Sequence, residues 1–208
     1  GLPKPFPIIA TRHHDTHAYF SYGCSPFNDT DELVMVTVLD GYGDDGSVSL
    51  YVAKDRQLAP VYQNGSMFDS LGVLYSVISS TQGGWTTLSS EGRYMGATAW
   101  GNNNRLTNPY YKRLRQLVYF GENGEFHLNR AMASWHLGGE HAPYGKALEN
   151  VLGRAVAPKD MWNPDAILRV DDTAHSEVTE ERLDKAAATQ LLFEDVLFHV
   201  IDHMIRTT

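Results

Sequence analysis

Hydrophobic and polar positions alternate most regularly between residues 32 and 65, where the pattern predicts three extended segments. ELVMVTVLDG is rich in β-branched residues, GSVSLYVAKD alternates polar and apolar positions, and LAPVYQNG has the composition of a third strand. Gly and Asp clusters separate the segments, as is typical of turns. The pattern predicts a meander that opens a β-sheet, with the first two strands adjacent and antiparallel.

Helical patterns lie on both sides of this predicted sheet. THAYFSYG ends in Gly23, which suits the position after a helix, and Pro26 prevents early resumption. SMFDSLGVLYSVISS has Ser66 as a cap and places apolar residues on one helical face. Those apolar residues are Met67, Leu71, Leu74 and Ile78.

In the C-terminal part of the chain, the sequence predicts a hairpin and one long helix. Asn123-Gly124 suits a tight hairpin turn. From Thr179 to Arg206 the chain has the period of an amphipathic helix. Its expected stripe consists of Leu183, Ala187, Gln190, Glu194, Leu197 and Ile201.

Composition narrows the possible classes of protein. The 208 residues are 42% hydrophobic, enough for a buried core, and no apolar run approaches the ~18 residues of a membrane span. Cys24 is the single cysteine, so no internal disulfide can form and a cytoplasmic location is expected. The formal net charge of -8 opposes binding to a phosphate backbone. We expect neither a nucleic acid nor a membrane as partner.

The stretch RHHDTHA contains the first candidate metal ligands. His13 and His17 are four residues apart, which on a helix brings their imidazoles to one face. Imidazoles suit Zn, Fe, Ni or Cu, but two exposed or hydrogen-bonded histidines are an equally good interpretation of the spacing alone. Asp15 either orients a ligating imidazole or lies simply in the first helical turn.

A glycine-rich turn follows the first predicted strand. Asp40 ends that strand just before Gly41 and Gly43, where backbone amides can approach an anion and a carboxylate can bind a cation. An ordinary hairpin turn is the alternative, and taken by itself the turn favours it. His199 and His203 repeat the four-residue spacing, but we interpret them as part of a solvated helix face opposite the Leu197 stripe.

Ordered motifs along nearly the whole chain resemble one family. They are HHDTHA, VLDGYGDDGS, SLGVLYSVIS, EGRYMGATAWG, NPYYKRL and AAATQLLFEDVL. In this order they are similar to the O-carbamoyltransferases, typified by nodulation protein U and the antibiotic-tailoring carbamoyltransferases. The resemblance implies an α/β fold, namely an incomplete actin-like ATPase (ribonuclease H-like) lobe with a mixed sheet and flanking helices. It further implies that residues 1–30 end a first lobe and that residues 31–208 form most of a second.

The resemblance also implies a reaction. In the family, carbamoyl phosphate and ATP yield a carbamoyl adenylate, and the carbamoyl group then passes to an acceptor hydroxyl at an iron-binding site. The metal ligands of the family, with Fe²⁺ or another divalent ion, fall on His13, His17 and Asp40. Gly41, Gly43 and Asp44 would face the nucleotide, and His14 is a candidate general base by position.

A further loop matches the family in part. Glu91, Gly92 and Gly96 fit its pattern, while Arg93 stands where Lys is usual. This loop either lines the substrate channel and contacts the co-substrate or is a structural turn and helix start.

We expect the chain to be a fragment, inactive by itself. The resemblance implies that the first phosphate loop, a further Asp ligand, the nucleotide loop and the carbamoyl-activating domain lie elsewhere in the polypeptide. Its partners would be that remainder and a small hydroxylated acceptor. A metal-dependent hydrolase, a sugar-kinase-like enzyme and a non-catalytic binding module remain alternatives. A complete ligand set with tight nucleotide binding would favour the enzymes, and weak metal binding with preserved folding would favour the module.

Overall fold

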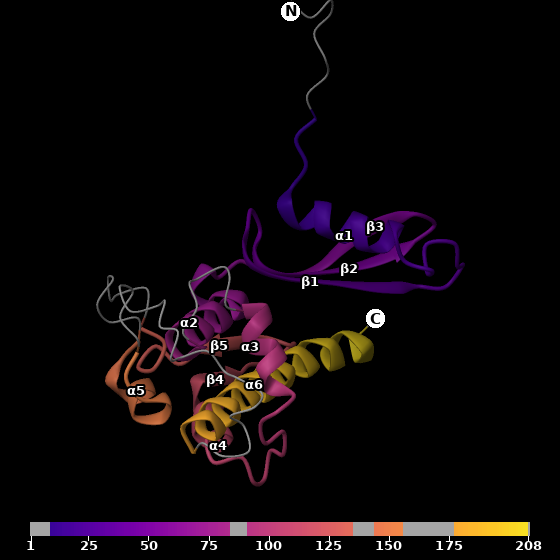
Figure 1. Cartoon of the computed structure of the whole chain (residues 1–208). Coiled ribbons are helices and arrows are strands. Elements are labelled where there is room, and N and C mark those ends of the chain that lie inside the picture. Colours follow the sequence, from indigo (N-terminus) through magenta and orange to yellow (C-terminus); the bar gives the residue numbers. More distant parts are fainter. Residues whose placement is uncertain (1–8, 84–90, 135–143, 156–176, 208) are drawn as a thin grey trace, which may run out of the picture. The chain divides into compact units, whose positions relative to one another are not determined.

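The computed structural model describes residues 9–83, 91–134, 144–155 and 177–207 (Figure 1). The chain divides into two compact units, Gly1–Gly72 and Val73–Thr208, and we describe each by itself. This division does not coincide with the lobe boundary expected at residue 30, and the assignment of lobes stays a prediction.

The first unit is a helix on a three-stranded sheet (Figure 1). The sheet is an antiparallel meander in the order β1-β2-β3, as the alternation of the sequence predicts. Helix α1 lies along one face of it (Figure 1). The bounds are α1 His13–Gly23, β1 Val34–Gly43, β2 Gly46–Lys54 and β3 Gln57–Asn64, followed by the short helix η1 Met67–Asp69.

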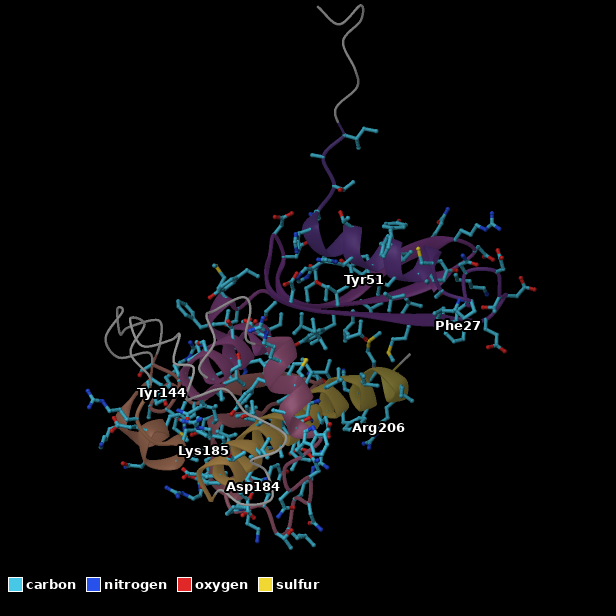
Figure 2. The ribbon with its side chains drawn as sticks, viewed as in Figure 1. Phe27, Tyr51, Tyr144, Asp184, Lys185 and Arg206 are labelled. Atoms are coloured by element: carbon cyan, nitrogen blue, oxygen red, sulfur yellow. The ribbon has the colours of Figure 1, made fainter. Side chains whose placement is uncertain are left out.

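The core of this unit lies between α1 and the sheet. Ala18 and Tyr22 of α1 pack on side chains from β1 and β2. Because residues opposite each other in an antiparallel pair share a face, the pairing of Val36 with Tyr51 puts both toward α1. Tyr51 is seen between α1 and the sheet in Figure 2. The remaining core residues are Val38 and Ala53, with Val34 and Leu58 partly buried beside them.

Strand β1 is irregular at the end that carries the candidate ligand. Its pairing with β2 is regular from Val34 to Leu39, shifts register, and resumes only at Gly43 opposite Gly46. A bulge of this kind bends a strand and redirects the side chains next to it. Asp40 therefore lies in a stretch where the ladder does not fix its orientation.

The second unit is mostly helical. Helix α2 Leu71–Gly83 crosses from the first unit into the second, and Leu74 and Ile78 on its predicted apolar face are buried. Met67 of the expected face is exposed, because it belongs to η1 rather than to α2. The other helices are α3 Glu91–Thr98, α4 Tyr111–Leu114, η2 Arg115–Leu117, α5 Lys146–Leu152 and α6 Glu177–Thr207.

A short hairpin lies between η2 and α5 along the chain. Strands β4 Val118–Phe120 and β5 Phe126–Leu128 pair antiparallel. Asn123 and Gly124 between them both have positive φ, at 57° and 74°, which is the backbone of the type I′ turn that the sequence predicts. Both sheets of the described residues are antiparallel, so the parallel pairing that a mixed sheet requires does not occur among them.

Helix α6 confirms the predicted long helix but not its whole stripe. Leu183 and Ala187 are buried as expected. Further along, the expected residues Leu197 and Ile201 are only half-buried. The residues just before them, Val196 and Val200, are buried instead, and so is Met204 one turn later. Both sets recur every four residues, so packing rather than periodicity selects the buried one. In the described ranges, no helix combines the length and apolarity needed to cross a membrane.

Candidate metal centre

The N-terminal turn of α1 is held by the β1–β2 hairpin. Arg12 at the N-cap makes no side-chain cap, and the carboxylate of Asp44 instead accepts the backbone N–H of His13 at 2.8 Å. Arg12 also pairs with Asp45 at 3.2 Å. A carboxylate at this end satisfies an orphan donor and complements the helix dipole. The hairpin thus fixes where α1 begins.

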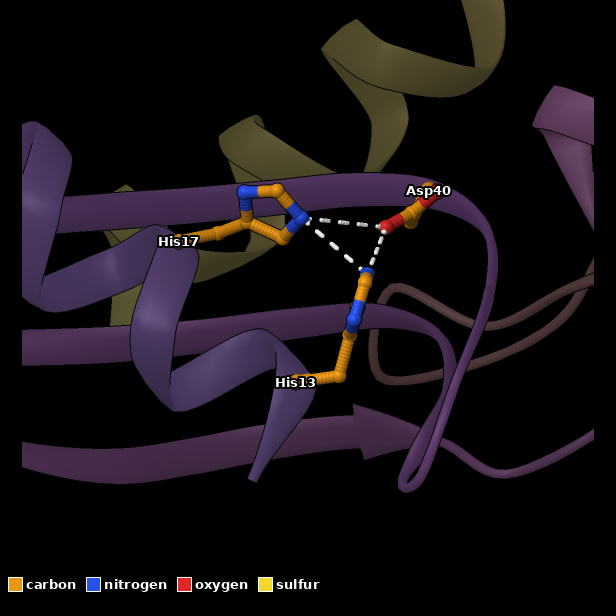
Figure 3. Close-up of side chains that lie close together, drawn as sticks. All are labelled: His13, His17 and Asp40. Atoms are coloured by element: carbon orange, nitrogen blue, oxygen red, sulfur yellow. Dashed lines mark hydrogen bonds and ion pairs between the residues drawn. The ribbon is translucent and has the colours of Figure 1, made fainter. Parts of the chain in front are cut away.

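The four-residue spacing puts His13 and His17 on one exposed face of α1. The redirected end of β1 brings Asp40 to the same place. One carboxylate oxygen of Asp40 lies 2.7 Å from Nε2 of His13 and 3.4 Å from Nε2 of His17. The two imidazole nitrogens are 3.1 Å apart, and Figure 3 shows all three side chains pointing to one point.

Asp40 is held as a carboxylate. Burial by itself raises the pKa of Asp40. The hydrogen bonds from His13 and from the N–H of Gly41, together with the nearby imidazoles, lower it by more, so the pKa lies below its usual value. Gly41 donates to the second carboxylate oxygen at 2.6 Å. One oxygen is therefore fixed by the backbone, and the other faces the two histidines.

The donor set fits a transition-metal ion. Two imidazoles and one carboxylate suit Zn or Fe and leave further positions for water or substrate. Tetrahedral bonds of about 2.0–2.2 Å place donor atoms about 3.3–3.6 Å apart. The observed separations of 2.7–3.4 Å need only a small expansion to reach this range. In the part of the chain that the structure describes, this is the single such group of His, Cys, Asp and Glu.

Comparison with known proteins assigns the chain to a family. The family model described as "Carbamoyltransferase N-terminus" matches residues 4–205. The chain belongs to this carbamoyltransferase family. It is also 26% identical over 196 residues to the uncharacterized protein sll1178 of Synechocystis sp., covering 93% of this chain and 27% of that protein. The chain thus spans about a quarter of the length of this curated relative.

The family assignment agrees with the resemblance seen in the sequence, but it names no site residues. Of the residues expected to act, the structure brings together His13, His17 and Asp40. Metal binding by them stays a prediction.

His14 has a position unlike that of its neighbours. It is completely buried, and its Nδ1 lies 2.6 Å from the hydroxyl of Ser49 on β2. Burial lowers the pKa of His14 below its ordinary value, so the imidazole is neutral at pH 7. A buried ring is poorly placed to take a proton from an acceptor, and this geometry does not favour the general-base role expected from sequence position.

Asp15 lies in the first turn of α1, which confirms one of the two interpretations of the sequence. Its carboxylate accepts a hydrogen bond from the hydroxyl of Tyr51 at 2.9 Å, instead of orienting a ligating imidazole. The sequence interpretation missed both Ser49 and Tyr51. The alternation of strand β2 could have indicated them, because Ser47, Ser49 and Tyr51 lie on the same face of that strand.

The glycine-rich turn is tied to α1 at two of the expected nucleotide-facing residues. Asp44 caps α1, and Gly43 lies against the ring of His14. Gly41 has open space where a side chain would be. Contact of these residues with a nucleotide stays a prediction for this carbamoyltransferase domain.

The EGRYMGATAWG motif forms a helix rather than a loop from its first residue. Glu91, Gly92 and Gly96 lie on α3, Glu91–Thr98, in the second unit. Open space surrounds both glycines. The helix start that we considered for this motif is thus present, and a role in lining a substrate channel stays a prediction.

A groove of about 380 Å³ opens beside the cluster within the first unit. His17 and Asp40 line one end of it, and Phe20, Thr37 and Leu39 line the rest. The volume lies in the range of small-molecule sites. Two members of the cluster, His17 and Asp40, therefore line a groove that is open to solvent.

Proposed function

We propose that this chain is the metal-binding part of a carbamoyltransferase that transfers a carbamoyl group to an acceptor hydroxyl. The carbamoyl group comes from carbamoyl phosphate through a carbamoyl adenylate made with ATP. The observation that carries the proposal is the convergence of His13, His17 and Asp40 in a chain of the carbamoyltransferase N-terminus family. An actin-like, ribonuclease H-like lobe is the fold proposed, supported by the antiparallel meander followed by a helix.

The residues of the first unit have distinct roles in this proposal. His13, His17 and Asp40 hold a divalent ion, with Fe²⁺ as the expected metal. When bound, such an ion polarises a carbonyl and offsets negative charge on phosphate oxygens. Gly41 keeps one oxygen of Asp40 in place through its N–H. The groove beside His17 gives an acceptor access to the centre.

The transfer balances as an acyl substitution. The acceptor oxygen forms a bond to the carbamoyl carbon, and the bond from that carbon to the phosphate oxygen of the adenylate breaks. AMP leaves with the electron pair, and the hydroxyl proton passes to a base or to water. We assign that proton to a group other than His14, because His14 is buried. Holding the two reactants together can lower the barrier by roughly 7–11 kcal/mol.

The complete activity would involve more polypeptide than this chain. The chain covers 27% of its Synechocystis relative, so a carbamoyl-activating domain and further nucleotide-binding loops belong to the proposal rather than to the described residues. In this proposal the remainder of the polypeptide is the main partner.

Metal binding by the 208-residue chain is the first test. We expect Co²⁺ or anaerobic Fe²⁺ to bind at one site, and His13→Ala or Asp40→Ala to weaken binding by at least about 100-fold, more than the loss of an outer partner of a ligand would cause. Isothermal titration and the visible spectrum of bound Co²⁺ measure this. The matched control is His203→Ala, which alters a histidine pair of the same spacing on α6.

Activity of the full-length protein is the second part of the test. With carbamoyl phosphate, ATP, Fe²⁺ and a hydroxylated acceptor, the full-length protein should form the carbamoylated product, and His13→Ala should abolish it. The 208-residue chain should form none. Transfer by the short chain at the rate of the full-length protein, or full activity of a His13→Ala, Asp40→Ala double variant, would place the chemistry elsewhere.

A further inference from the structure

Two separate segments carry the proposed ligands, so something must fix their spacing. His13 and His17 lie on α1, while Asp40 lies in the irregular last part of β1. Two of the links between these segments are at the surface. One is the ion pair between Arg12 and Asp45, and the other is the hydrogen bond that the backbone N–H of His13 donates to Asp44. The Arg12 side chain is 62% exposed, and exposed pairs hold geometry only weakly.

His14 is the buried link between the same two segments. Its side chain leaves α1 on the face opposite the solvent and reaches the hairpin, where Nδ1 bonds to Ser49. The edge of its ring, at Cδ2 and Nε2, occupies the space that a side chain on Gly43 would fill. Nε2 is buried and has no hydrogen-bond partner among the described residues. One bond and one close contact thus fix the ring.

The backbone does not explain the glycine at position 43. Gly46 in the same turn has a φ of 105°, which favours glycine, but Gly43 is not among the residues of positive φ. A Cβ on Gly43 would overlap the His14 ring, whereas a Cβ on Gly41 would meet nothing within 4 Å. Glycine at position 43 is therefore matched to the imidazole at position 14.

We propose that His14 is a positioning residue, whose ring, seated against Gly43 and bonded to Ser49, sets the distance between the ligands on α1 and Asp40. The inference rests on the proposed metal site and adds a residue that does not touch the metal. Closely packed side chains transmit small displacements, because the interior has few voids to absorb them. Pushing the ring away from Gly43 would move α1, and with it His13 and His17, away from Asp40.

The decisive variants replace two glycines of the first unit, Gly43 against the His14 ring and Gly65 in open space. In the 208-residue chain, Gly43→Ala should weaken Co²⁺ binding by roughly 10–100-fold, as expected when a group that orients metal ligands is displaced. It should also change the visible spectrum of the bound Co²⁺, because the three donors are re-spaced. Gly65→Ala is the matched control, because a Cβ at Gly65 would also meet nothing within 4 Å, and it should leave both the affinity and the spectrum unchanged.

A rescue distinguishes positioning from loss of folding. His14→Ala alone should weaken Co²⁺ binding, and the double variant Gly43→Ala, His14→Ala should bind more tightly than Gly43→Ala, because the added methyl then fills space left by the ring. Val34→Ala, which removes packing at the far end of the sheet, should lower the unfolding midpoint without changing the Co²⁺ spectrum.

The outcomes separate the two proposals. If wild type and Gly65→Ala bind no Co²⁺ at all, the metal site itself is wrong and the positioning role falls with it. If they bind Co²⁺ and Gly43→Ala binds equally well with the same spectrum, the metal site stands and the role of His14 is overturned. A double variant no better than Gly43→Ala would also overturn it.

Discussion

Helices α1 and α6 each carry two histidines four residues apart, and the structure gives the two pairs different surroundings. On α1, His13 and His17 meet Asp40 within hydrogen-bonding distance. On α6, the ring of His199 stacks parallel on Phe120, with the ring centroids 4.2 Å apart, and its Nε2 donates to a backbone carbonyl at 3.0 Å. The spacing supplies two imidazoles on one face, and the opposing segment decides their use.

Two aspartates near these pairs, Asp40 and Asp195, have different partners. Asp40 offers one oxygen to the histidines of α1. Asp195 lies one turn before His199, but its oxygens are taken by Arg105 at 2.9 Å and by the hydroxyl of Tyr111, with Arg115 at 3.6 Å. A carboxylate neutralised by arginines stabilises a fold, whereas one that faces imidazoles can join them in binding a cation.

The largest expected effect on folding tests this contrast between carboxylates. Asp195→Ala removes the acceptor of several charged or polar donors, and should lower the free energy of unfolding by roughly 2 kcal/mol. Asp40→Ala in the metal-free chain should change it by less than about 1 kcal/mol, because its partners are half-exposed. Denaturation followed by circular dichroism in EDTA measures both.

Asp195→Asn serves as the control, because it keeps the shape and one acceptor while removing the charge. It should fall between wild type and Asp195→Ala. Equal destabilisation by Asp40→Ala and Asp195→Ala would mean that Asp40 is a structural residue of the same kind.

Most of the local structure could be predicted from the sequence, because local patterns determine it. Helix α1 ends where the sequence predicts, although Gly23 is its last helical residue rather than the residue after it, and Asn123 and Gly124 adopt the turn that their dipeptide favours. The second half of the α6 stripe could not be predicted. Val196 and Leu197 are both apolar and adjacent, and only the packing of the second unit decides that Val196 is the buried one.

The convergence of the three candidate residues was predictable from the sequence, but the residues that support them were not. The pattern of motifs, more than the spacing, pointed to His13, His17 and Asp40. The partners of His14 and Asp15 depend on which residues of β2 face α1, and that follows from strand register. A shift of one residue would turn Ser49 and Tyr51 to the opposite face.

A smaller effect is expected at the α6 pair itself. His199→Ala removes the stacked ring and the hydrogen bond to the Glu125 carbonyl, and should lower the free energy of unfolding by about 1 kcal/mol. Co²⁺ binding should be unchanged, and titration together with chemical denaturation checks the two statements. Loss of Co²⁺ binding in His199→Ala would show that the two histidine pairs are not functionally different.

The smallest expected effect concerns one tyrosine in each unit. The pKa values of Tyr51 and Tyr144 are both raised to about 12. Burial is the main cause for each, but the Tyr51 hydroxyl also donates to the Asp15 carboxylate. Since both folded values exceed the unfolded value of about 10, the neutral phenols stabilise the fold fully below pH 10, and this contribution is lost as the pH rises toward 12.

Asp15→Asn should lower the pKa of Tyr51 and leave the pKa of Tyr144 unchanged. Ultraviolet titration of phenolate, with Tyr51→Phe and Tyr144→Phe to assign the steps, measures this, and an equal shift of both tyrosines would contradict a local role for Asp15.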